Sequence, residues 1–318
     1  MNAASSWGLY TVAVTNGPHV APIAGGYIAQ RLGWRWCFWI PAFIQSGLCI
    51  VVFITFPESL FSRVDQNRLA GQSLAKRLFF HGKILDRKVR LRDSMLSLRM
   101  VKYAAVTLPA LWYCTANTYG SALFAVTGSA IGKKVFKFDV EQTGLWVGIP
   151  STIGCFIGEM SAGWVSDVMS NADARRRDGH HKPEARLYLL PGCTLLAIGT
   201  ATFGYCVQHH KPWIQAAVCL AVSGFGTQFG TTIVYLYTTD CYKAQGPEIG
   251  VVINLFTSVF AFNIGFYGLR FSENVGFDSA FAIFAAINAA LELPLVVLLF
   301  RGEQIRMEQG NPKDHQDL

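Results

Sequence analysis

The chain has 318 residues, of which 52% are hydrophobic and only 15% are charged, and its formal net charge is +7. A soluble domain carries about 25% charged residues and no apolar run of membrane-spanning length, so this composition excludes an ordinary soluble protein. Most of the positive charge lies in one loop between apolar segments, which is typical of membrane topology signals and argues against a nucleic-acid partner.

Eight apolar segments are long enough to cross a bilayer, because a spanning helix needs about 20 predominantly apolar residues. In chain order they are 7–30, 34–56, 103–126, 143–166, 187–207, 213–237, 249–270 and 279–300. No charged region precedes the first span and a second span follows at once, so we predict no cleaved signal peptide. The sequence therefore predicts an all-α, polytopic bundle in the lipid bilayer.

The segment 57–102 is polar and carries eleven of the 27 Lys and Arg residues. With eight spans, the connections near 167–186 and 238–248 and the tail after residue 300 fall on the same side of the membrane. That side then holds 20 Lys and Arg residues, and the opposite side holds 7. Because basic loops are retained in the cytoplasm, we expect both termini to be cytoplasmic.

Motifs for catalysis and metal binding are missing from the sequence. The eight cysteines lie in or beside apolar runs, without a CxxC pair or a Cys/His cluster of metal-ligand spacing, and we expect small buried hydrophobes there. There is no nucleophile elbow, HExxH motif, P-loop or dinucleotide fingerprint. We predict no metal, no cofactor and no enzyme activity, and we expect an ion gradient to drive any transport.

Three local patterns occur in a fixed order around the basic central segment. The first span and the turn after it carry Gly17, Pro18, Pro22, Gly25, Gly26 and then Gly33-Trp34-Arg35-Trp36. The end of the fourth span and the loop after it carry Gly163, Asp167, Arg175, Arg176 and Arg177. Asp240-Cys241-Tyr242 follows the sixth span. Together they resemble transporters of the major facilitator superfamily, especially the proton-coupled antiporters of fungi, with a departure at Ala21, where the family usually has glycine.

This resemblance implies a twelve-helix fold of which about eight helices are present, the first span being family helix five. The implied parts are the last two helices of the N-terminal half (1–56), a cytoplasmic central loop (57–102), a six-helix C-terminal half (103–300) and a cytoplasmic tail (301–318). The counterparts of the first four family helices are not in the sequence. We interpret this as a truncated product or an incomplete gene model, with a shortened natural protein as the alternative.

Two groups of residues are candidates for conformational control. Pro18 and Pro22 lie one helical turn apart, and each removes a backbone donor and bends the helix. The resemblance implies a seal against leakage there, and the alternative is a bent packing helix. Asp167 can pair with a guanidinium of Arg175–Arg177 to form a latch between conformations, and the alternative is a surface ion pair of ~0–1 kcal/mol.

Polar groups inside the spans are candidates for binding substrate or protons, because ionisable groups are costly in a membrane. Tyr113 and Asn117 are four residues apart and share one helical face. Further candidates are Glu159, Gln228, Asn254 and Glu292. The alternatives are pairing of Glu159 with the nearby basic loop, a protonated Glu292 bonded to another helix, and helix–helix hydrogen bonds for the amides.

These observations favour secondary active transport of a small organic solute by alternating access, with proton antiport as the specific form. The plasma membrane is the expected location, and a vacuolar membrane is the alternative. The rival hypotheses are a chain that does not transport on its own, either inert or acting as an interaction partner, and a membrane-bound enzyme.

Overall fold

The computed structural model describes residues 3–55, 97–176 and 182–310. Most of the predicted central loop, Arg177 and the end of the predicted tail lie outside these ranges. The described residues form the helices α1 (Ala3–Arg31), α2 (Trp36–Thr55), α5 (Ala104–Asn117), α6 (Leu123–Lys134), α7 (Val140–Arg176), α8 (Leu190–Gln208), α9 (Trp213–Cys241), α10 (Gly246–Val275) and α11 (Phe277–Gln309). Shorter helical turns are η2 (Ser97–Lys102), η3 (Thr118–Ala122), η4 (Pro183–Leu189) and η5 (Lys243–Gln245).

Each of the eight predicted spans coincides with one helix, when α5, η3 and α6 are taken as one rod, although α6, α7 and α11 continue beyond the predicted ends at 126, 166 and 300 to Lys134, Arg176 and Gln309. The prediction of an all-α bundle is therefore confirmed. Within the described ranges, five helical segments are long and apolar enough to cross a membrane: Trp36–Ile54, Pro183–Gln208, Trp213–Cys241, Lys243–Val275 and Phe277–Gln309. The other three predicted spans are α1, the α5–α6 rod and α7.

The rod formed by α5 and α6 contains a π-helical turn at η3, directly after Asn117. Gly120 lies in this turn, and a Cβ atom on it would come within 2.7 Å of Leu196 Cδ1 on α8. The π-helical turn therefore brings the backbone of the rod against its neighbours in the bundle. Such turns are frequent at functional sites, and the sequence pattern did not reveal this one.

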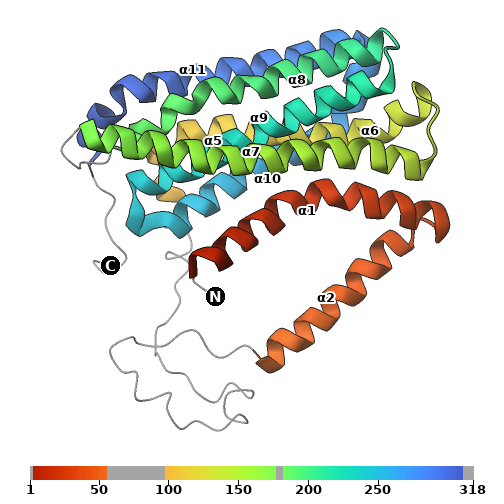
Figure 1. The fold of residues 1–318 in the computed structure, drawn as a ribbon, viewed down its shortest axis with the longest axis horizontal. Helices are drawn as coiled ribbons and strands as arrows, with labels where there is room; N and C mark the ends of the chain where they lie inside the picture. Colours follow the sequence, from red (N-terminus) through yellow and green to blue (C-terminus); the bar gives the residue numbers. More distant parts are fainter. Residues whose placement is uncertain (1–2, 56–96, 177–181, 311–318) are drawn as a thin grey trace.

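Helices that follow one another along the chain run in opposite directions, so the connections alternate between the two ends of the bundle (Figure 1). Helices α5 to α11 form the bundle, and α1 lies along α7. The turn between α1 and α2 depends on Gly33, whose φ of +92° is open to glycine and strained for other residues. Beyond this turn α2 leads away from the bundle (Figure 1).

Helix α2 is apolar on all sides, and none of its membrane-spanning window is buried. Phe38 and Phe43, for example, expose 70% and 61% of their surface. A helix with apolar residues all round needs either protein or lipid around it. The exposed surface of α2 therefore fits contact with a bilayer.

Two clusters of apolar side chains form the interior of the bundle. One surrounds Trp112, Leu196 and Ile233, where α5, α8 and α9 meet. The second is aromatic and contains Phe203 and Phe281, whose ring centroids are 5.3 Å apart. Apolar burial and aromatic packing therefore hold the helices at fixed positions, which places the polar side chains described below.

Candidate functional site

The contact between α1 and α7 is a backbone-to-backbone contact made by glycines. A Cβ atom on Gly26 would lie 3.1 Å from the Cα atom of Gly144, and a Cβ atom on Gly144 would lie 3.1 Å from the Cα atom of Gly26. One turn along, a Cβ atom on Gly148 would lie 3.0 Å from the carbonyl oxygen of His19. Only glycine at these positions lets the two helices approach so closely.

The predicted gating residues of the first span do not all take part in this contact. Pro18 and Pro22 both lie inside α1, which continues through them as one helix and curves (Figure 1). Gly26 faces α7, but a Cβ atom on Gly17 or Gly25 would have no neighbouring atom within 4 Å. Gly144 and Gly148, which contact α1, were not among the predicted gating residues, although the spacing Gly144-x-x-x-Gly148 is a known helix-packing signal.

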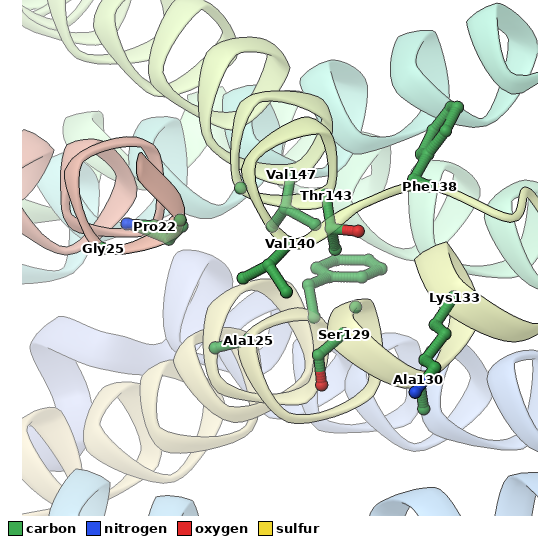
Figure 2. A pocket seen from close by; sticks show the side chains of 14 residues that line it. Pro22, Gly25, Ala125, Ser129, Ala130, Lys133, Phe138, Val140, Thr143 and Val147 are labelled. Atoms are coloured by element: carbon green, nitrogen blue, oxygen red, sulfur yellow. The ribbon is translucent and has the colours of Figure 1, made fainter. Parts of the chain in front are cut away.

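A cavity of about 610 Å³ lies beside the glycine contact. Its walls come from α1, from α6, from Phe138 in the connection after α6, and from the beginning of α7 (Figure 2). Pro22, Gly25 and Gly26 belong to its lining, and most of the remaining lining is apolar, with Ser129, Lys133 and Thr143 as polar members. The cavity therefore places three of the predicted gating residues at the edge of an open space.

At the opposite end of α7, Asp167 forms an ion pair with Arg186 of η4. The distance from Arg186 Nη1 to Asp167 Oδ1 is 3.2 Å. Nη1 of Arg186 also donates to Ser166 Oγ at 2.8 Å, and its Nε donates to Asp240 Oδ2 at 2.9 Å. Arg186 therefore connects the end of α7 to the end of α9.

The partner of Asp167 was expected within Arg175–Arg177, and in the structure it is Arg186. Arg175 is exposed near the end of α7, the side chain of Arg176 is not among those described, and Arg177 lies outside the described residues. Gly163 lies one turn before Asp167 with open space on its Cβ side. Arg186 was missed because a pairing between residues 19 positions apart leaves no periodic signal, although its position beside Pro183 and Glu184 marked it as part of the same loop.

A second pair of ionic contacts ties η4 to α11. Arg306 Nη2 lies 2.6 Å from Glu184 Oε1, and the side chains expose only 20% and 10% of their surface. Lys182 also pairs with Glu303. The short turn η4 is therefore attached by charged groups to α7, α9 and α11 at one end of the bundle.

The predicted substrate residues of α5 lie against α9. The rings of Tyr113 and Tyr235 meet edge to face with centroids 5.6 Å apart. Tyr113 also forms side-chain hydrogen bonds with Asn117, Thr231 and Tyr235. These four residues, which we call the tyrosine patch, combine hydroxyl and amide groups with aromatic surface.

The remaining candidates do not join the tyrosine patch. Gln228 is buried on α9, and Asn254 is exposed on α10. Glu159 is buried on α7 and Glu292 is buried on α11, at 9% and 7% exposure. Across the described parts of the chain, no group of three or more His, Cys, Asp or Glu side chains could hold a metal ion.

Comparisons with known proteins agree with this architecture. The chain is similar to the MFS-type transporter hepF of Aspergillus oryzae, with 27% identity over 300 residues that cover 91% of this chain and 60% of that protein. It is 26% identical to the Probable efflux pump mfs2 of Aspergillus flavus, covering 96% of this chain and 74% of that protein. It is 24% identical to the Efflux pump radE of Floropilus chiversii, covering 91% of this chain and 55% of that protein.

The chain thus spans between about half and three quarters of the length of these relatives. They are named as transporters or efflux pumps, which agrees with the prediction that the chain is a membrane transporter and not an enzyme. The family model of the Major Facilitator Superfamily matches residues 2–179, which is more than half of the chain. The chain belongs to the Major Facilitator Superfamily.

Proposed function

We propose that this protein carries a small organic solute across the membrane by alternating access, and that protons move in the opposite direction. The observation that supports this most strongly is the glycine contact between α1 and α7. It joins the proposed N-terminal part (1–56) to the proposed six-helix part (103–300). Between them lies the proposed cytoplasmic loop 57–102, and after them the proposed tail 301–318.

The glycine contact suits a movable interface. Backbones that meet through Gly26, Gly144 and Gly148 have no long side chains interlocked between them, so one helix can rock against the other. Pro18 and Pro22 weaken the hydrogen bonding of α1 at the same level and let it bend. In our proposal these residues, with Gly17 and Gly25, form the gate, and the 610 Å³ cavity gives the gate room to move.

The ion cluster around Arg186 supports a latch at the other end of α7. Arg186 reaches Asp167 on α7 and Asp240 on α9, so a relative movement of these helices would break one of its bonds. An interaction made in only one conformation shifts the equilibrium between the two. We propose that Gly163 lets the end of α7 move and that Arg175, Arg176 and Arg177 add positive charge around the latch.

The tyrosine patch is the proposed substrate site. Its aromatic faces, hydroxyl groups and amide can bind a small organic molecule by stacking and hydrogen bonding. Gln228 and Asn254 are further proposed contacts on neighbouring helices. Glu159 and Glu292 are the two candidates for the proton carrier, because a carboxyl group inside a span can bind and release a proton.

The charge distribution supports an orientation with both termini in the cytoplasm. Eight spans place 20 Lys and Arg residues on one side and 7 on the other, and the side with more positive charge is retained inside. The end of the bundle that carries the latch would then be cytoplasmic, and the cavity beside the gate would lie towards the outside. We propose the plasma membrane as the location, with a vacuolar membrane as the alternative.

A reconstitution experiment tests this function. The purified full chain is inserted into liposomes with an imposed pH gradient, and uptake from a panel of cationic, neutral and anionic organic solutes is measured by mass spectrometry. We expect at least one solute to accumulate against its gradient, and a protonophore to abolish the accumulation. Uptake equal to that of protein-free liposomes for every solute would reject independent transport and favour the second hypothesis, a chain that acts as an interaction partner.

A further inference from the structure

A buried polar cluster lies away from the gate, the latch and the tyrosine patch. It occupies the region where α11 packs against α5 and α8, and its members are Thr115, Cys193, Asn288 and Glu292. Thr115, Cys193 and Asn288 each expose 1% of their surface, and Glu292 exposes 7%. In a membrane-spanning bundle, this position keeps the polar groups away from bulk water.

Hydrogen bonds fix the orientation of the Asn288 amide. The hydroxyl of Thr115 donates to the carbonyl oxygen of Trp112 at 2.9 Å, so it can only accept from Asn288. Nδ2 of Asn288 donates to Thr115 Oγ1 at 3.1 Å. The amide nitrogen therefore points to α5, and the oxygen Oδ1 points away from Thr115.

Asn288 Oδ1 is a buried acceptor that has no hydrogen-bond partner among the described residues. An unsatisfied buried acceptor destabilises the folded protein, so a donor is expected there. The indole nitrogen Nε1 of Trp112 is also a buried donor without a hydrogen-bond partner among the described residues, and the Cζ3–Cη2 edge of this indole faces Gly230 on α9. Glu292 lies four residues after Asn288 and thus on the same face of α11, one turn away.

Glu292 can satisfy Asn288 only when it carries a proton. An ionised carboxylate is an acceptor on both oxygens and would oppose Asn288 Oδ1, whereas a protonated carboxyl donates one O–H. No Lys, Arg or His in the described residues acts on Glu292 to compensate a negative charge, and the titratable group that interacts with it is the thiol of Cys193 on α8. The residues contributed by α5 are neutral, namely Trp112 and Thr115.

We propose that Glu292 is the proton-carrying acid of the six-helix part, and that Asn288, held by Thr115, is a positioning residue that binds the protonated carboxyl. The inference rests on the proposed proton coupling and names the site of the proton. When the proton leaves, two acceptors face each other, so the Asn288 amide must turn and its bond to Thr115 breaks. Proton release on α11 thereby loosens α5, the helix that carries Tyr113 and Asn117 of the tyrosine patch.

Infrared spectroscopy of the full chain in lipid nanodiscs tests the proton site without any substrate. The wild type is expected to show the C=O stretch of a protonated carboxyl, and the band is expected to disappear as the pH is raised. Glu292→Gln removes the band, and this variant folds because its amide N–H can still donate to Asn288. Glu273→Gln, at an exposed ion pair with Lys134, leaves the band unchanged.

A second variant keeps the test decisive. In Asn288→Leu the protonated carboxyl has lost its acceptor, so the band is expected to disappear at a lower pH than in the wild type, by about one unit for one hydrogen bond. The inference is overturned if the wild type lacks the band, if Glu292→Gln retains it, or if Glu159→Gln removes it in place of Glu292→Gln.

Transport separates this inference from the proposed function. For any solute that the wild type accumulates, Glu292→Gln is expected still to exchange the solute across the liposome membrane. The factor by which a pH gradient accelerates uptake is expected to be at least tenfold smaller than in the wild type. Retention of that acceleration would overturn the role of Glu292. If the wild type shows no gradient-driven uptake at all, the proposed function fails, and the infrared band alone decides whether Glu292 holds a proton.

Discussion

The glycine contact between α1 and α7 makes a sharp prediction for a single methyl group. In Gly144→Ala the new Cβ atom would lie 3.1 Å from Gly26 Cα and 3.3 Å from the carbonyl carbon of Pro22. These are backbone atoms, which cannot turn aside as a flexible side chain can. Overpacking of this kind costs about 1–3 kcal/mol. We expect the contact between α1 and α7 to be destabilised by that free energy.

Gly163→Ala is the matched control, because Gly163 lies on the same helix with no neighbouring atom within 4 Å of its Cβ position. Both variants gain the same intrinsic helix stability, about 0.5–1 kcal/mol for glycine to alanine. That gain cancels in the comparison, which leaves the overpacking cost of about 1–3 kcal/mol as the difference between the two variants.

Hydrogen–deuterium exchange of the α1 backbone amides measures this difference in lipid nanodiscs. The exchange of α1 is expected to be about 5- to 150-fold faster in Gly144→Ala than in Gly163→Ala, which is the factor for 1–3 kcal/mol. Equal protection of α1 in the two variants would refute the backbone contact and, with it, the proposed gate.

Three further substitutions test other parts of the structure. Arg186→Lys keeps the charge but loses the planar guanidinium that reaches Asp167 and Asp240. We expect it to lower the unfolding free energy by about 1–2 kcal/mol, and therefore the melting temperature. The control Arg175→Lys leaves the melting temperature unchanged. Glu184→Gln leaves the largely buried Arg306 without its carboxylate, so we expect a loss of up to about 3–5 kcal/mol in unfolding free energy. A loss below about 0.5 kcal/mol would contradict the buried ion pair. Tyr113→Phe removes the hydroxyl that bonds Asn117, Thr231 and Tyr235, and for an accumulated solute we expect uptake at low concentration to fall about tenfold, with Tyr27→Phe on the exposed face of α1 as the control.

Much of the fold could be predicted from the sequence because a bilayer imposes a length and a composition on every span. The eight predicted segments coincide with helices for this reason, and the short connections fix the antiparallel order. The π-helical turn after Asn117 could not be predicted, since its residues Thr118–Ala122 are equally compatible with a regular α-helix.

The candidate site was harder to predict because its contacts join distant residues. The pattern Gly25-Gly26 does not say which glycine faces a neighbour, and the structure shows that only Gly26 approaches α7. The pairing of Asp167 with Arg186 depends on the path of η4, which no local pattern reveals. Asn288 was overlooked because one amide in an apolar helix is common, and only its free oxygen beside Glu292 makes it informative.

The direct test of proton-coupled transport is to record both fluxes in the same liposomes. A pH-sensitive dye inside the vesicles reports protons, while mass spectrometry follows a solute found in the uptake panel. Our account predicts that adding the solute on one side, without an imposed pH gradient, moves protons towards the side to which the solute was added, and that the proton signal disappears in Glu292→Gln. Solute uptake without any proton movement in the wild type would contradict it.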